Sequence, residues 1–362
     1  MRIAQIAPLY ESVPPKLYGG TERVASFLTE ELVRRGHQVT LFASGDSVTS
    51  AELVAGSPSA FRLDPSLGNT LPYHLTMLDQ VMRRAEDFDI LHFHTDLLHF
   101  PLVRPFQDRT LTTLHGRIDY RDLEWFFSHF SDIPLAAISE DQRRPMPHLN
   151  WAGTVYNGLP RDMLRQGGGD GGYLAFLGRI SPDKGPDTAI EIAVRAGLTL
   201  RIAAKIDVMD RQYWEEVIGP LVARSPRVEY VGEVTEQEKA EFLGKALGLI
   251  FPITWREPFG LVMIEAMSCG TPVVAFRNGS VPEVVEDGVT GFIVDNTDEA
   301  VDAVGRLPQL HRNTVRATFE RRFTAEHMAD GYLRIYADLL AAGPRLGTQR
   351  DDNPGLRTVT SP

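Results

Sequence analysis

Short apolar segments alternate with amphipathic segments along the first half of the chain. The helix expected over 21–35 places its apolar side chains on one face, and Gly36 suits its end. The same pattern predicts a second helix over 75–85. Short apolar runs predict strands over 2–7, 39–43, 90–94, 109–114 and 135–138. This alternation is typical of a parallel sheet covered by helices on both faces.

The second half of the chain repeats this alternation. Helices are expected over 186–196, 236–246 and 261–268, and another runs from Ala325 to about Leu340. Strands are expected over 173–177, 200–204, 228–231, 249–251, 273–276 and 291–294. The fold class is therefore α/β, with two Rossmann-like domains whose parallel sheets face each other across a cleft.

A glycine-rich segment separates the two halves. Five of the eight residues from Arg165 to Gly172 are glycine, which predicts a flexible linker over 166–172 that also serves as a hinge. We expect an N-terminal domain over 1–165 and a C-terminal domain over 173–325. A helix over 326–342 is expected to cross back to the first domain. The polar tail, 343–362, is expected to be disordered.

Composition narrows the class of protein. The 362 residues are 43% hydrophobic and 23% charged, as in ordinary soluble proteins, and the formal net charge of −11 argues against nucleic acid or an anionic membrane as main partner. No apolar run approaches the ~18 residues that span a bilayer, and the N-terminus is too short an apolar run for a signal peptide, so we expect a cytoplasmic protein. The single cysteine, Cys269, is expected to be a small core residue.

Two glutamates, Glu257 and Glu265, are the most informative candidates for chemistry. Seven residues separate them, and the chain between them passes from a Pro/Gly loop into an apolar helix. The start of a helix favours anions, because its backbone N–H groups are free and its dipole is positive there. Carboxylates at such a site are better suited to hydroxyl groups. The combination predicts a ligand with both a phosphate and a polyol, such as a sugar nucleotide.

Two further segments of the second half resemble anion sites. Gly178 and Arg179 follow a strand, and Lys184 and Gly185 precede a helix, so the two cations suit a diphosphate unless they are ordinary solvated loop residues. A third Gly-bearing loop, 277–283, also leads into a helix, although a plain turn has the same pattern.

In the first half, Gly19 and Gly20 precede a helix and let the backbone approach a ligand. The chain carries no G-x-G-x-x-G and no Walker A sequence.

Histidines are concentrated on two strands of the first half. A zinc site from His92, His94 and Asp96 is one interpretation, but buried strand histidines are more often core residues. His115, at a strand end before a glycine, is the better candidate for an active site. The pair Asp87 and Asp89 resembles a metal-binding D-x-D, yet its place before a strand favours a simple helix-to-strand junction.

The order of these motifs resembles that of retaining glycosyltransferases of family 4, which have the two-domain GT-B architecture. Asn278-Gly279-Ser280 departs from the family, which commonly has two glycines there. The matching segments are Tyr18-Gly-Gly-Thr-Glu22, Thr113-Leu-His-Gly116, Tyr156-Asn-Gly158, Leu177-Gly-Arg179 with Lys184-Gly185, Glu257-Pro-Phe-Gly-Leu-Val-Met-Ile-Glu265, Cys269-Gly-Thr-Pro-Val-Val274, and Val281-Pro-Glu-Val-Val-Glu-Asp-Gly-Val-Thr-Gly291.

The resemblance implies roles for individual residues. Arg179 and Lys184 pair with the diphosphate of a nucleotide sugar, Glu265 binds the ribose diol, and Glu257 lies near the transferred sugar. His115 contacts that sugar, whereas Glu22 and His94 lie nearer the acceptor. The remaining donor-binding positions are Gly19, Gly20, Gly178, Phe259, Gly260, Leu261 and Val262.

The expected reaction is retaining transfer of a hexose from a nucleotide-diphosphate sugar to an acceptor hydroxyl, without a cofactor or metal. UDP-sugars are favoured, and GDP-mannose fits the same motifs. Front-face attack, with the acceptor proton passing to the leaving phosphate, is preferred over double displacement through Glu257. The alternatives are a sugar-nucleotide 2-epimerase, a glycan phosphorylase, or a nucleotide-sugar-binding protein without turnover.

The acceptor, a small molecule or glycan, is not determined by the motifs. Two segments, 51–73 and 118–130, are candidates for its pocket. Trp125, Phe126 and Phe127 in the second segment are equally compatible with core packing.

Overall fold

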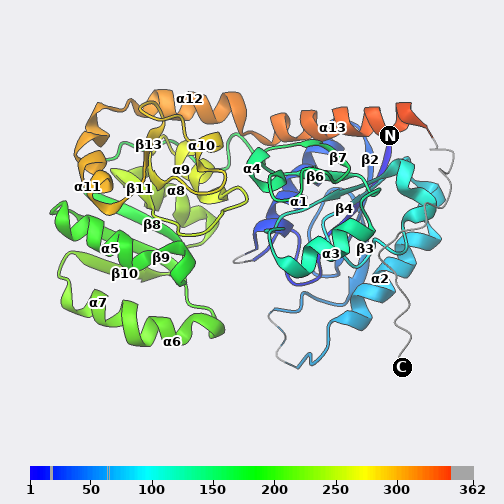
Figure 1. Ribbon diagram of the computed structural model, residues 1–362, viewed down its shortest axis with the longest axis horizontal. Helices are drawn as coiled ribbons and strands as arrows, with labels where there is room; N and C mark the ends of the chain where they lie inside the picture. Colours follow the sequence, from blue (N-terminus) through cyan, green and yellow to red (C-terminus); the bar gives the residue numbers. More distant parts are fainter. Residues whose placement is uncertain (17–18, 63, 65, 344–362) are drawn as a thin grey trace, which may run out of the picture.

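The computed structural model describes residues 1–16, 19–62, 64 and 66–343 (Figure 1). The chain forms two lobes, and helices α12 and α13 run along the same side of both (Figure 1). The tail expected over 343–362 lies outside the described residues, apart from Gly343.

The N-terminal lobe is built on a seven-stranded sheet in the order β3-β2-β1-β4-β5-β6-β7, with every pairing parallel. Its strands are β1 (Arg2–Ile6), β2 (Gln38–Ser44), β3 (Glu52–Ser57), β4 (Ile90–Phe93), β5 (Thr110–Thr113), β6 (Leu135–Ala137) and β7 (Trp151–Thr154). Its helices are α1 (Gly20–Arg34), α2 (Leu71–Arg83), α3 (Arg121–His129) and α4 (Glu140–Arg143). The two edge strands, β3 and β7, were not predicted.

The C-terminal lobe has a six-stranded parallel sheet in the order β10-β9-β8-β11-β12-β13. Its strands are β8 (Tyr173–Arg179), β9 (Thr199–Lys205), β10 (Val228–Gly232), β11 (Gly248–Phe251), β12 (Val273–Phe276) and β13 (Gly291–Val294). The helices between these strands are α5 (Pro186–Arg195), α6 (Arg211–Tyr213), α7 (Gly219–Arg224), α8 (Glu236–Lys245), α9 (Leu261–Ser268) and α10 (Val281–Val284). A π-helical turn, Trp214–Ile218, joins α6 to α7.

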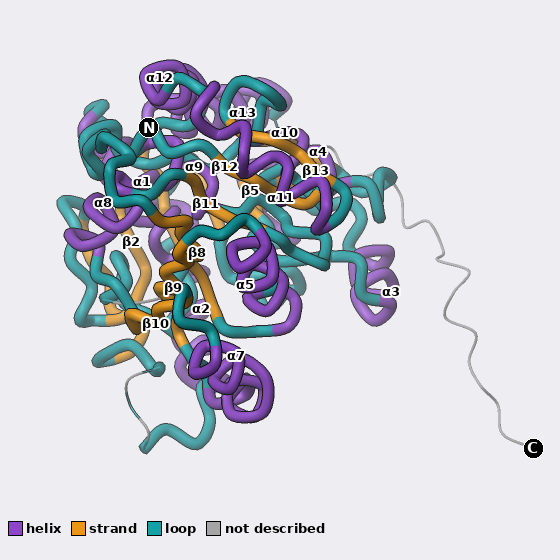
Figure 2. The backbone as a smooth tube through the Cα atoms, turned by 90° about the vertical axis from the view of Figure 1, so that its left-hand side faces the viewer, coloured by secondary structure: helices purple, strands orange, loops and turns teal. Residues whose placement is uncertain are grey.

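Helices cover both faces of this second sheet, which is why its strands are nearly continuous apolar runs. Figure 2 shows α5 and α7 on one side of β8, β9 and β10, and α8 on the other. Two further helices, α11 (Thr297–Arg306) and α12 (Arg312–Arg322), follow the last strand and were not predicted. Two parallel sheets with helices confirm the predicted fold class.

The last helix, α13 (Ala325–Ala342), returns to the N-terminal lobe. Its buried residues Met328, Tyr332 and Tyr336 belong to the same apolar cluster as Ile3 and Val24. Helix α13 is therefore part of the N-terminal core.

The glycine-rich segment, predicted as a linker, packs against the C-terminal lobe. The backbone N–H of Gly167 donates to the carbonyl of Cys269 at 3.0 Å, and that of Gly171 donates to the carbonyl of Lys245 at 2.9 Å. A Cβ on Gly167 would lie 2.3 Å from the carbonyl oxygen of Gly244. These glycines therefore permit close packing at this place.

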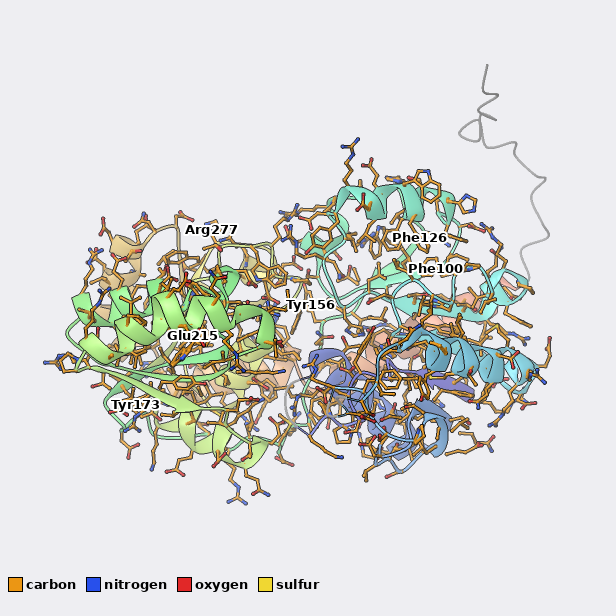
Figure 3. All side chains as sticks on the ribbon, turned by 90° about the horizontal axis from the view of Figure 1, so that it is seen from below. Phe100, Phe126, Tyr156, Tyr173, Glu215 and Arg277 are labelled. Atoms are coloured by element: carbon orange, nitrogen blue, oxygen red, sulfur yellow. The ribbon has the colours of Figure 1, made fainter. Side chains whose placement is uncertain are left out.

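The chain passes between the lobes at two adjacent places instead. Leu159 and Thr324 form an isolated parallel β-bridge, and a Cβ on Gly158 would lie 2.2 Å from the carbonyl oxygen of Thr324. Tyr156, just before this crossing, lies at the junction of the two lobes (Figure 3). The two crossings between the lobes therefore lie near 155–159 and 323–325.

Candidate active site

A cavity of about 840 Å³ lies between the two lobes. Parallel α/β sheets place ligands at the carboxyl ends of their strands, and both sheets contribute such loops here. The predicted residues in its wall are Gly19, Gly20, Glu22, His115, Gly178, Arg179, Lys184, Glu257, Phe259, Gly260, Leu261, Val262 and Glu265. Thus the sequence positions chosen from both halves of the chain meet in one place.

The loop between β11 and α9 positions the first glutamate and an anion site together. Gly260, which caps the start of α9, has φ of 76°, a left-handed conformation that glycine adopts readily. Helix α9 begins at Leu261, and Leu261 and Val262 line the cavity. The free N–H groups and positive dipole end of α9 are therefore available to a phosphate or a sugar oxygen.

Glu257 is held by two neighbours. The ammonium of Lys184 contacts its Oε2, and the indole N–H of Trp255 donates to the same oxygen at 3.0 Å. The Lys184 ammonium also lies 4.5 Å from the centre of the Trp255 ring, a cation–π distance. Both side chains of the ion pair are largely buried, at 16% and 11% exposure, so their positions are well defined.

Arg179 is positioned by two acidic residues. Its Nε lies 3.2 Å from Oδ2 of Asp210, and its Nη2 lies 3.5 Å from Oδ1 of Asp183. The guanidinium still lines the cavity. A diphosphate would exchange these contacts for stronger bidentate ones.

Glu265 is paired with a residue that the sequence analysis did not select. The ammonium of Lys239, on α8, donates to Oε1 of Glu265 at 2.7 Å. Lys239 also lies 2.7 Å from Glu236, which forms an ion pair with Arg23 of α1 in the other lobe. A chain of alternating charges therefore crosses the cavity at this end.

On the N-terminal side, His115 stands in the cavity wall and His94 lies behind it. Nδ1 of His94 is 2.8 Å from Nε2 of His115, and Nε2 of His94 is 2.8 Å from the amide oxygen of Gln5. Burial lowers the pKa of His115 to about 4 and that of His94 well below its usual value, so both rings are neutral near pH 7. His94, which was expected near the acceptor, supports His115 from the core.

The zinc interpretation does not fit these rings. Nδ1 of His92 is 2.7 Å from the hydroxyl of Tyr336, and Nε2 is 2.7 Å from that of Thr113, so both nitrogens have partners. Within the described residues, no three His, Cys, Asp or Glu side chains are grouped to hold a metal ion. Asp89 of the D-x-D sequence accepts from the backbone N–H of Arg2 at 2.8 Å, as a junction residue does.

Two carboxyl groups on the N-terminal side of the cavity are unusual. Burial raises the pKa of Glu22 to about 7, and it also raises the pKa of Asp96. Asp96 has φ of 51°, a left-handed conformation that is rare for residues other than glycine. Both residues line the cavity, so two carboxyl groups with raised pKa values face it.

The third loop predicted as an anion site supports Glu257 instead. The backbone N–H of Ser280 donates to the carbonyl of Glu257 at 3.0 Å. Gly279 has φ of 56°, and a Cβ on it would lie 2.3 Å from that same carbonyl oxygen. Arg277 pairs with Asp295 at 3.0 Å on the surface. This loop is therefore a platform under the segment that carries Glu257.

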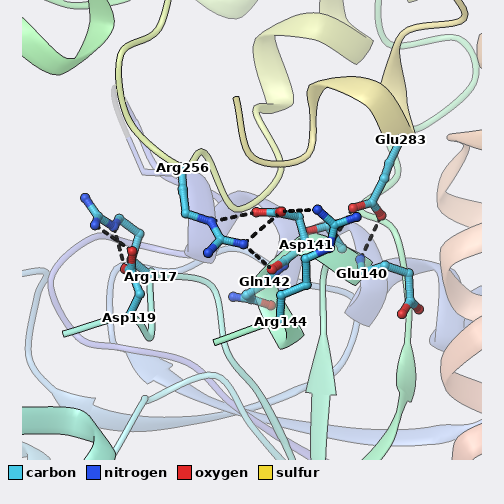
Figure 4. Close-up of polar contacts among 9 residues, drawn as sticks. Arg117, Asp119, Glu140, Asp141, Gln142, Arg144, Arg256 and Glu283 are labelled. Carbon is cyan, nitrogen blue, oxygen red and sulfur yellow. Dashed lines mark hydrogen bonds and ion pairs between the residues drawn. The ribbon is translucent and has the colours of Figure 1, made fainter. Parts of the chain in front are cut away.

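The helix that follows this loop joins the two lobes. The carboxylate of Glu283 accepts the backbone N–H groups of Glu140 and Asp141, both at 2.7 Å, at the start of α4 (Figure 4). Arg256, next to Glu257, donates to Asp141 at 2.9 Å and 3.1 Å (Figure 4). These contacts fix one edge of the cavity across the lobe boundary.

The two segments expected to form the acceptor pocket, 51–73 and 118–130, differ in whether they reach the cavity. Arg62, Thr70 and Leu71 line the cavity, so segment 51–73 reaches it. None of the described residues 118–130 does. Phe127 is buried in the core, and Trp125 is 76% exposed on the surface.

Three comparisons with known proteins agree with this architecture. The model described as Glycosyltransferase Family 4 matches residues 18–152, and the model described as Glycosyl transferases group 1 matches residues 168–317. Among solved structures, Anabaena HepE in complex with UDP and glucose superposes with a TM-score of 0.72 at 17% identity, over 92% of this chain and 99% of that one.

Curated relatives carry related names. A D-inositol 3-phosphate glycosyltransferase from Acidothermus cellulolyticus is 33% identical over 50% of this chain and 44% of its own length. An N-acetyl-alpha-D-glucosaminyl L-malate synthase from Bacillus anthracis is 24% identical over 93% of this chain and 96% of its own.

The two parallel sheets with their helices have the GT-B architecture of the solved neighbours, and the matching family models identify the chain as a glycosyltransferase. The chain belongs to glycosyltransferase family 4. No helix among its described residues is long and apolar enough to cross a membrane.

Proposed function

We propose that this chain transfers a hexose from a nucleotide-diphosphate sugar to an acceptor hydroxyl with retention of configuration. One observation carries the proposal: Glu257 and Glu265 lie in one cavity wall with the start of α9 between them, and each has a lysine beside it. A sugar nucleotide has hydroxyls at both ends and a diphosphate between them, which matches this order of groups.

The donor diphosphate lies against Arg179, Lys184 and the first amides of α9 in this proposal. Cations and a helix dipole stabilise the charge that develops on the leaving phosphate, so the reaction needs no metal. A UDP-sugar is favoured, because HepE was solved with UDP and glucose. GDP-mannose is the second candidate.

Bond exchange takes place on one face of the sugar. The bond from the anomeric carbon to the phosphate oxygen breaks, the acceptor oxygen bonds to that carbon from the same side, and the acceptor proton passes to the departing phosphate. The carboxylate of Glu257 stabilises the positive charge on the sugar. His115, with a neutral ring, binds a sugar hydroxyl.

Proton NMR of the product tests this reaction. With an α-linked donor and EDTA present, the product should be α-linked. A β-linked product would contradict retention, and loss of turnover in EDTA would contradict metal independence. A glycosyl group trapped on Glu257 would replace front-face attack by double displacement, and a donor converted to its epimer would make the chain an epimerase.

A further inference from the structure

Lys239 is a buried cation in the cavity wall with no role in the proposal above. Its side chain is only 13% exposed, and its ammonium lies 2.7 Å from Oε1 of Glu265 and 2.7 Å from Oε1 of Glu236. It lines the cavity together with both carboxylates. Burying an ammonium is costly unless its charge is paired, so the two carboxylates are what allow Lys239 to be buried here.

The start of α8 fixes the position of Lys239. Thr235 and Glu238 form a capping box, in which each side chain bonds to the other's backbone N–H. This leaves Glu236 and Lys239, three residues apart, on the same face of the helix. Glu236 also pairs with Arg23 of α1, so the lysine is held from both lobes.

Lys239 keeps its charge in this position. Burial opposes the charged form, but the attraction of Glu265 and then of Glu236 outweighs it and raises the pKa of the ammonium. An ammonium has three N–H donors. One of them donates to Glu265 at 2.7 Å, and because Lys239 lines the cavity, another can donate to a ligand there.

We propose that Lys239 binds the ribose of the nucleotide donor together with Glu265. The inference rests on the proposed function. A ribose hydroxyl can donate to the Glu265 carboxylate and accept from the Lys239 ammonium at the same time, which a deoxyribose position cannot do. The pair therefore makes the site specific for ribonucleotides and adds a binding residue to the glutamate.

Isothermal calorimetry on Lys239→Met tests this role. The probe is UDP or GDP, whichever the unmodified protein binds more tightly, with its 2′-deoxy and 3′-deoxy forms. A hydrogen bond to a charged group accounts for about 10-fold to 100-fold in affinity. The unmodified protein should prefer the ribonucleotide over at least one deoxy form by about this factor. Lys239→Met should bind the ribonucleotide more weakly and lose part of the preference, because Glu265 still accepts from the hydroxyl.

Lys245→Met is the matched control. Lys245 ends the same helix and is 51% exposed in a pair with Glu241, so its loss should change neither affinity nor preference. Should Lys239→Met not fold by circular dichroism, Lys239→Gln keeps N–H donors without the charge and should show an intermediate preference.

Three outcomes separate the hypotheses. A variant that binds the ribonucleotide and its deoxy forms more weakly by the same factor would keep the full preference. So would a variant whose affinities are unchanged, and either result would show that Lys239 has only a structural role. That result would leave the proposed function intact. An unmodified protein that binds neither UDP nor GDP would contradict the proposed function itself.

Discussion

The indole N–H of Trp255 donates to Oε2 of Glu257 at 3.0 Å, and the ammonium of Lys184 contacts the same oxygen. One carboxylate oxygen is therefore held from two sides. The carboxylate can change neither rotamer nor distance from the cavity without losing both contacts. This arrangement explains how a loop residue is positioned for chemistry.

Trp255→Phe removes the N–H donor and keeps an aromatic ring beside Lys184. A hydrogen bond to a charged group contributes about 1.5–3 kcal/mol, so kcat should fall about 10-fold to 100-fold while the melting temperature changes little. Steady-state kinetics measure kcat and KM. If only KM rises, Trp255 contacts the donor and does not position Glu257.

Glu257→Ala and Lys184→Ala should each abolish transfer and leave the fold intact. Loss of one group that stabilises the transition state typically lowers kcat by about 10²–10³. We therefore expect kcat to fall by at least about this factor in each variant. Arg277→Ala is the control for loss of a cation, because Arg277 pairs with Asp295 on the surface. Near-normal turnover in both site variants would refute the assigned roles.

Gly279→Ala should impair catalysis more than stability. The added Cβ would lie 2.3 Å from the Glu257 carbonyl oxygen, so the catalytic loop must move. Gly288→Ala is a matched control: its φ of 72° imposes similar backbone strain, but nothing lies within 4 Å of the new Cβ. Turnover and the free energy of unfolding are measured for both. Equal losses of turnover in the two variants would contradict the platform role of this loop.

The pKa of Glu22 predicts how the stability of the fold depends on pH. Burial raises this pKa from 4.5 to about 7, so between these values the folded state holds a proton that the unfolded state has lost. The contribution of Glu22 to stability is therefore most favourable below pH 4.5 and falls as pH rises to 7, by on the order of 3 kcal/mol.

Urea denaturation of Glu22→Gln at pH 5 and pH 8 measures this effect. The variant cannot ionise, so its stability relative to the unmodified protein should increase with pH. Glu215→Gln, at an exposed position, should show no such trend. A constant difference between Glu22→Gln and the unmodified protein at both pH values would contradict a raised pKa.

The sequence predicted every strand except β3 and β7, and it selected the charged residues Arg179, Lys184, Glu257 and Glu265 of the cavity wall, because both depend on local signals. Apolar runs mark buried strands, and loops before helices mark the residues at strand ends. Glu257, Glu265 and Lys184 were selected in this way. Edge strands β3 and β7 were missed because they are partly exposed, so their apolar pattern is weak.

Residues that act through tertiary contacts had no local signal. Lys239 is one polar residue on an ordinary amphipathic helix, and only the fold places it at Glu265. Asp210 reaches Arg179 from a different loop. The glycine-rich segment suggested a linker, but glycine also permits close packing, and composition alone does not distinguish these uses. His94 was expected near the acceptor from the family resemblance, and only the fold shows that it lies behind His115, between that ring and Gln5.

A donor screen tests the central claim most directly. The protein is incubated with UDP- and GDP-sugars, and the released nucleotide and the sugar product are both quantified for the unmodified chain and for Glu257→Gln. The account predicts that one donor releases its nucleotide diphosphate in step with transfer of the hexose, and that Glu257→Gln lowers this rate by at least about 100-fold. A donor that binds to the unmodified protein but is never consumed with any acceptor, or unchanged release from Glu257→Gln, would contradict it.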